Sequence, residues 1–280
     1  MAPESTLATA GSIQSADGTK LAYRAWPRPG ASISFAVVHG LGDHAGRYAH
    51  FADGMSKHGM AAYALDLRGH GNSPGQRGHI DSWSQWTDDV AAFVTHIEQV
   101  AGTEVVALGH SFGGAALLST ILSGNLPTAT KRFVLSSPAL KLKLQAPGWK
   151  LKLGELASTI APRLALSNEV DPASISGLTE VVDAYRSDPL VHDRISSRMF
   201  TEWQKAVADI YQRAGQIKVP FLILAGTADL LIDPDGSHLL HEKTASVSTL
   251  RMLEGRYHEP FNDRGSDEVF QLIADWVSKK

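Results

Sequence analysis

The chain contains no cysteine among its 280 residues. This absence excludes disulfide bonds, a thiol nucleophile and a zinc site built on cysteine. Charge of either sign is in no large excess, with 26 lysines and arginines against 29 aspartates and glutamates and a formal net charge of −3. A basic surface that would indicate nucleic-acid binding is therefore missing, and we expect no nucleic-acid partner.

Long apolar runs are missing as well. No stretch of about 18 apolar residues is available to cross a bilayer. Residues Met1–Thr6 lack the basic region and the apolar core that are typical of a signal peptide. We therefore expect a cytoplasmic protein, with peripheral contact at membranes left open.

Cofactor motifs are also absent. No glycine-rich phosphate loop and no Gly-x-Gly-x-x-Gly follows a predicted strand, so nothing indicates a nucleotide cofactor. The 12 histidines do not include a His-x-x-x-His pair on a predicted helix, and His238 and His241 lack an evident third ligand. We expect no cofactor and no metal ion. The hydrophobic content of 43% is sufficient for a large core.

The most informative segment that is present is Gly109–Gly113, which reads GHSFG. It follows the apolar run Val105–Leu108, which is typical of a buried parallel strand, and it precedes a predicted helix. A serine on such a sharp strand-to-helix turn must adopt a strained backbone, and the two glycines let strand and helix approach closely. We predict that Ser111 is a nucleophile near a helix N-terminus.

A nucleophilic serine needs a base and an orienting acid, which follow it in the chain order Ser, Asp or Glu, His. Asp229 follows the apolar run Val219–Gly226, and His258 lies in the loop after the next predicted strand. We predict Asp229 as the acid and His258 as the base. Three weaker candidates remain: Asp233 for the acid, and His238 and His241 for the base.

The tetrahedral intermediate of an acyl transfer needs two backbone N–H donors around its oxyanion. One is the N–H of Phe112, directly after the serine. The second is expected from the loop after the predicted strand 34–38, where glycines at positions 40 and 42 let a backbone N–H turn inward. We predict that this donor is Leu41.

Several motifs together resemble one family. The segment His39–Tyr48 (HGLGDHAGRY) is similar to the oxyanion loop of monoacylglycerol lipases and related lysophospholipases, which reads His-Gly-x-Gly-Glu-His-x-x-Arg-Tyr. The similarity extends from about residue 12 to residue 278 and includes, in chain order, Asp66–Gly75, Arg77–Gly78, Gly109–Gly114, Ser187–His192, Gly226–Asp229 and Tyr257–Glu259.

The resemblance implies an α/β-hydrolase with a cap that acts on esters of a single long acyl chain, a small-molecule lipid substrate. By position it supports the same triad and the same two oxyanion donors. The chain departs from the family at Phe112, where methionine is more common, at Asp43, where glutamate is usual, and at Glu259–Asn262, which is closer to the lysophospholipase-like members. These departures affect the expected head-group preference and leave the triad intact.

Predicted strands alternate with predicted helices, which indicates a mainly parallel sheet with helices on both faces. This alternation stops between residues 139 and 205. We therefore predict a hydrolase core in two parts, 1–138 and 206–280, with a cap insertion at 139–205. Within the cap, apolar residues recur at helical spacing: Trp149, Leu153, Leu156 and Ile160.

This apolar face could line an acyl tunnel, pack on the core, or contact a micelle or membrane transiently, with Lys150 and Lys152 at its polar edge. Asp43 and Arg47 lie beside the oxyanion loop and are our candidate substrate-binding residues. Their alternative role, which we favour, is an internal ion pair that shapes the loop. The expected reaction is hydrolysis of monoacylglycerols through an acyl-enzyme on Ser111. The alternatives are a broad carboxylesterase, a lysophospholipase or a serine peptidase on the same fold.

Overall fold

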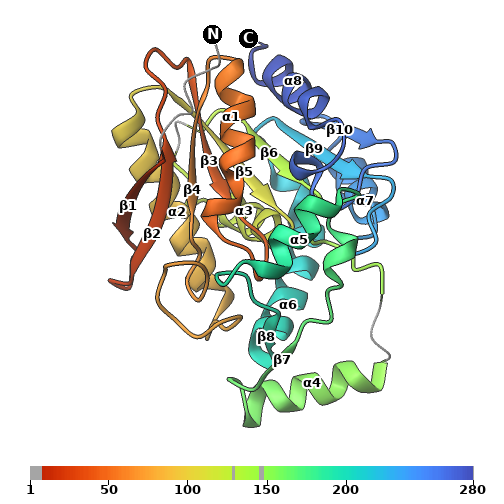
Figure 1. Cartoon of the computed structure of the whole chain (residues 1–280). Coiled ribbons are helices and arrows are strands. Elements are labelled where there is room, and N and C mark those ends of the chain that lie inside the picture. Colours follow the sequence, from red (N-terminus) through yellow and green to blue (C-terminus); the bar gives the residue numbers. More distant parts are fainter. Residues whose placement is uncertain (1–7, 128–129, 145–147, 280) are drawn as a thin grey trace.

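The computed structural model describes residues 8–127, 130–144 and 148–279. Its centre is a sheet of eight strands in the order β1-β2-β4-β3-β5-β6-β9-β10 (Figure 1). The strands are β1 (Thr9–Gln14), β2 (Lys20–Trp26), β3 (Ile33–Val38), β4 (Ala61–Leu65), β5 (Glu104–His110), β6 (Phe133–Ser136), β9 (Phe221–Gly226) and β10 (Ser248–Leu253).

The sheet is antiparallel at its start and parallel from β4 to β10. β2 pairs antiparallel with both β1 and β4, and every later pairing runs parallel. The carboxyl ends of the parallel strands therefore meet at one edge, where substrates bind in open α/β sheets. The predicted fold class, a mainly parallel doubly wound sheet, is confirmed.

Side chains of the central strands alternate between two apolar layers. In β3, Phe35 and Val37 pack into one layer, whereas Ala36 and Val38 pack into the other. Helices α1 (Ala49–Lys57) and α8 (Ser266–Val277) cover the first layer. The second is covered by α2 (Trp83–Ala101), α3 (Phe112–Ser123), α6 (Ser197–Arg213) and α7 (Asp235–Thr244). Burial on both faces explains why these strands are continuous apolar runs.

A second unit is inserted between β6 and α6. It contains α4 (Gly148–Ile160), β7 (Ala165–Ser167), α5 (Thr179–Ser187) and β8 (Arg194–Ser196), with β7 and β8 forming a small antiparallel sheet. Figure 1 shows α4 at the end of the molecule opposite α8, well away from the central sheet. The helix expected from the apolar spacing is therefore present. Within the described residues, no helix is long and apolar enough to span a membrane.

The limits that we predict for the cap, residues 139 and 205, stay predictions. No element ends at 205, because α6 runs through that position. Its apolar face is buried in the core layer of α2 and α3, through Met199, Trp203 and Ile210. The first turns of α6 therefore join the inserted unit to the core without a break.

Close packing of α3 against the sheet explains why glycines stand at positions 109 and 113, on either side of the predicted nucleophile. A Cβ atom on Gly113 would lie 2.3 Å from the carbonyl oxygen of His39 and 2.4 Å from that of Val38. A Cβ on Gly109 would lie 2.7 Å from the Gly113 carbonyl oxygen. Any side chain at either position would push α3 away from the sheet.

We predict that Gly113→Ala destabilises the protein by about 3 kcal/mol, because the added methyl group would clash with backbone atoms that cannot move without shifting α3 or the sheet. Gly154→Ala is the matched control. Gly154 lies inside α4 with nothing within 4 Å of a built Cβ, so the same substitution there should stabilise by about 0.5–1 kcal/mol. Urea unfolding of both variants measures the difference, and equal effects would contradict the packing argument.

Candidate active site

Ser111 forms the turn between β5 and α3 with φ of 51° and ψ of −121°. This conformation is rare for a residue other than glycine and costs about 1–3 kcal/mol. Backbone hydrogen bonds hold it in place: the Ser111 N–H donates to Ser136 (2.9 Å), and the Ser111 carbonyl accepts from Gly114 (3.0 Å) and Ala139 (2.9 Å). The predicted strand–serine–helix turn is confirmed, and it lies at the carboxyl edge of the parallel strands.

His258 and Asp229 lie side by side on neighbouring loops. The Nδ1 atom of His258 is 2.8 Å from Oδ2 of Asp229, and both side chains are buried. The His258 ring also packs against the ring of His110, the residue before Ser111, with 4.8 Å between ring centres. These contacts bring His258 and Asp229 together, from the loops after β10 and β9, and place the His258 ring against the residue that precedes Ser111.

The environment fixes the charge of this pair. Burial alone would raise the pKa of Asp229, but His258 and the N–H groups of Ile232 and Leu231 hold it below its ordinary value. Burial alone would lower the pKa of His258, but the charge and hydrogen bond of Asp229 raise it above its ordinary value. The carboxylate is therefore ionised at neutral pH and orients the imidazole, as a base of this kind requires.

The weaker candidates lie elsewhere. Asp233 pairs with Lys141 at 2.9 Å and has no hydrogen bond to His258. His238 is exposed on α7. His241, on the same helix, contacts the Ser248 hydroxyl at 2.7 Å. Geometry therefore favours Asp229 and His258 over all three alternatives.

The loop after β3 lies against the serine turn. A Cβ on Gly40 would be 3.0 Å from the Cβ of Ser111. The buried His39 ring accepts the Leu67 N–H at Nε2 (3.0 Å), so its Nδ1 carries the proton and donates to the Gly40 carbonyl (2.7 Å). Across a trans peptide the carbonyl and the next N–H point in opposite directions. His39 thus turns the Leu41 N–H away from its own ring.

Phe112, the residue of the other predicted donor, is the first residue of α3. The first N–H groups of a helix have no intrahelical acceptor and carry the positive end of the helix dipole. The Phe112 side chain is buried and stacks on Trp203 of α6, with ring centres 5.2 Å apart. The aromatic ring that replaces the usual methionine is thus accommodated by the helix that leaves the cap.

Asp43 and Arg47 form an ion pair at 3.1 Å, and Arg47 also makes a two-pronged contact with Glu259 at 2.7 and 2.8 Å. All three side chains are at most 10% exposed. With its donors occupied, Arg47 is not available to a head group in this arrangement. The geometry therefore supports the internal ion pair rather than direct substrate contact.

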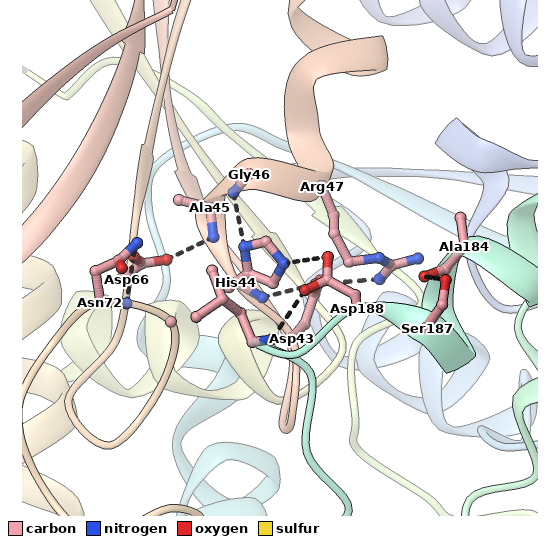
Figure 2. A network of polar contacts seen from close by, with 12 residues as sticks. Asp43, His44, Ala45, Gly46, Arg47, Asp66, Asn72, Ala184, Ser187 and Asp188 are labelled. Carbon is pink, nitrogen blue, oxygen red and sulfur yellow. Dashed lines mark hydrogen bonds and ion pairs between the residues drawn. The ribbon is translucent and has the colours of Figure 1, made fainter.

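Hydrogen bonds join the inserted unit to the loop after β3. His44 Nε2 lies 2.8 Å from Oδ2 of Asp188, at the end of α5, and Gly46 donates to Nδ1 of the same ring at 3.1 Å (Figure 2). Asp188 also accepts from the Leu190 N–H at 2.9 Å, a contact that orders the turn after α5. On the other side of the site, the buried carboxylate of Asp263 accepts from Tyr257 and Gly177.

Two residues around the site received no role from the sequence. His39 was only part of a glycine loop, and one of its ring contacts is with Leu67, 28 positions away in the loop after β4. Glu259 was noted only as a departure after the predicted base, and its partner Arg47 lies 212 positions upstream. Opposite charges in two distant loops do not indicate a pairing in the sequence, because the loops come together only when the sheet forms.

Comparisons with known proteins show the family to which the chain belongs. Residues 31–265 match the family model described as serine aminopeptidase, S33. The monoacylglycerol lipase of Mycolicibacterium smegmatis is 30% identical over 93% of each chain. The crystal structure of Paleococcus ferrophilus monoacylglycerol lipase is 32% identical, covers 97% of this chain and 98% of its own, and has a TM-score of 0.79.

A third relative is an uncharacterised abhydrolase-domain protein of Dictyostelium discoideum. It is 31% identical over 96% of this chain, which spans only 29% of that longer protein. The chain therefore belongs to the family described as serine aminopeptidase, S33, within the α/β-hydrolases. It is a carboxylic ester hydrolase similar in sequence and fold to the monoacylglycerol lipases.

We predict that Asp229→Asn lowers kcat/KM by roughly a thousandfold or more, because an amide cannot stabilise the imidazolium and favours the wrong tautomer. Asp233→Asn removes only a partly exposed ion pair and should cost less than about tenfold. Steady-state hydrolysis of a short soluble ester, with thermal unfolding of both variants as the control, tests this. The reverse order of effects would assign the acid to Asp233.

Proposed function

We propose that the protein hydrolyses monoacylglycerols to a fatty acid and glycerol, with Ser111, His258 and Asp229 as the catalytic triad. The observation that supports this most directly is the buried His258–Asp229 pair beside a strained serine turn. A strained residue persists only where the surrounding structure holds it, and such residues gather at active sites.

In the proposed reaction, His258 takes the hydroxyl proton as the Ser111 oxygen attacks the ester carbonyl. The resulting oxyanion accepts hydrogen bonds from the N–H groups of Leu41 and Phe112, each worth about 3 kcal/mol in the transition state. His258 then gives its proton to the departing glycerol oxygen, and the acyl group stays on the serine. Water, deprotonated by the same histidine, releases the fatty acid.

The choice of substrate rests on the relatives, since the two with monoacylglycerol lipase in their names cover nearly the whole chain at 30% identity or more. The family description names an aminopeptidase instead. A peptidase of that kind needs a group to bind the charged substrate terminus, and the cap carboxylates Glu169, Asp171 and Glu180 form no continuous acidic run in the sequence. A broad carboxylesterase or a lysophospholipase is the remaining alternative.

A lipid substrate has to be taken from a micelle or membrane, and the cap exposes apolar side chains that suit contact with such a lipid surface. Six apolar side chains on and around α4 and β7 are more than half exposed: Leu144, Leu153, Leu156, Ile160, Leu164 and Leu166. Lys152 is exposed on the same helix, whereas the side chains of Trp149 and Lys150 fall outside the described ones. Exposed apolar groups beside a cation suit transient contact with a micelle or membrane.

We expect fatty acid release from a long-chain monoacylglycerol to exceed release from a triacylglycerol, a lysophospholipid and a short p-nitrophenyl ester. Ser111→Ala should reduce all turnover at least about a thousandfold while the protein stays folded. Turnover of the short ester alone would keep the triad and assign a small-ester carboxylesterase. Near-native turnover by Ser111→Ala would contradict the nucleophile.

The double variant Leu156→Asp, Ile160→Asp should bind phospholipid vesicles less well and lose activity on aggregated monoacylglycerol, with activity on a soluble ester retained. Each buried apolar group contributes free energy in proportion to the area it removes from water. Val100→Asp is the control, since Val100 is 52% exposed on α2. Equal vesicle binding by both variants in a flotation assay would exclude the cap as the contact surface.

A further inference from the structure

The loop that carries His258 is held by a cation from a different part of the chain. Arg47 Nη1 and Nη2 donate to the two carboxylate oxygens of Glu259, at 2.8 and 2.7 Å, and Nη1 also donates to Asp43 at 3.1 Å. The guanidinium carbon lies 4.7 Å from the ring centre of Tyr185 on α5. Arg47 thus contacts the oxyanion loop, the histidine loop and the cap at once.

Glu259 directly follows His258, and its backbone is held too. Its N–H donates to the Ile175 carbonyl of the cap at 2.8 Å, and its side chain accepts from Asn262 at 3.0 Å. The position of this carboxylate relative to the imidazole is therefore set by the fold rather than by a flexible side chain. Figure 2 shows Arg47 and Asp43 next to the contact between His44 and Asp188.

The charged and titratable groups around His258 come from every neighbouring loop. Asp229 contacts the ring directly, and Glu259 and Asp43 each favour its protonated form. His110 packs on the ring but is neutral, because burial and the nearby His258 lower the pKa of His110 to about 4. The Asp263 carboxylate is occupied by backbone N–H groups of Tyr257 and Gly177. Arg47 is the cation that contacts two of the carboxylates just named.

We propose that Arg47 is a positioning residue for His258: by offsetting the charges of Glu259 and Asp43, it sets the pH at which the imidazole loses its proton. Three carboxylates without this cation would hold the imidazole protonated at neutral pH, and a protonated imidazole cannot take the serine proton. A general base works best when it is largely free at the operating pH. This inference rests on the proposed triad.

Burial makes the effect large. Charges that are at most 10% exposed are poorly screened by water and salt, so each change of charge acts strongly on a neighbouring imidazole. An opposite charge close to a titratable group typically shifts its titration by about one pH unit or more. The acidic limb of the kcat/KM profile reports the free-enzyme base directly.

The test is the pH profile of kcat/KM on a short soluble ester from pH 5 to 9, with the rate of Ser111 modification by an organophosphorus ester as a second readout. Glu259→Gln should move the acidic limb down by about one pH unit, and Arg47→Met should move it up by a similar amount. In the double variant Arg47→Met, Glu259→Gln, the acidic limb should lie close to its native pH, because one charge of each sign is lost. Arg47→Lys keeps the charge and should also stay close to native.

Arg256→Met is the matched control. Arg256 lies in the same loop, two residues before His258, but its partner Glu268 is 81% exposed and screened by water. This variant should leave the acidic limb in place.

A loss of thermal stability without a shift of the limb, shifts of the two single variants in the same direction, or an equal shift in Arg256→Met would overturn the proposal. If Arg47→Met does not fold, Glu259→Gln against Arg47→Lys still decides it. If the acidic limb keeps its native position in both of these variants, or shifts equally in both, the proposal is overturned. Failure of the triad itself is recognised separately. In that case Ser111→Ala retains turnover and Ser111 is not modified, whatever the limb does.

Discussion

The close approach of α3 to the ends of β3 and β5 is the constraint on which the site depends. Gly109 and Gly113 leave no room for a side chain, and this contact forces Ser111 into its positive φ. The same contact brings the loop after β3 against the serine, as two N–H donors on either side of it would require. Strain at one residue is thus held by packing over three elements, which is how a stable scaffold can maintain a reactive conformation.

The sequence was sufficient for the elements that depend on local pattern. The strand–serine–helix turn, the parallel sheet and the helix at 148–160 follow from apolar periodicity and glycine placement. Asp229 was preferred over Asp233 because it follows the strand end more closely, and the hydrogen bonds agree. Chain order and strand ends are strong signals because parallel strands deliver their loops to one edge.

Contacts between distant loops could not be predicted in the same way. Arg47 and Glu259 are 212 positions apart, and nothing in the local pattern of either loop indicates the pairing. The cap boundary at 205 is obscured because α6 continues through it with a single amphipathic face. His39 shows the same limit, since the roles of its two ring nitrogens follow only from what each one contacts in the folded chain.

The separation of these groups along the chain has a consequence for folding. Asp229 and His258 are 29 positions apart, in the loops after β9 and β10, and Ser111 follows β5, which is separated from β9 in the sheet by β6. Parallel pairings of this kind require large loops to close before any contact forms, so they are slow steps. During refolding, we therefore expect hydrolytic activity to return later than the helix signal.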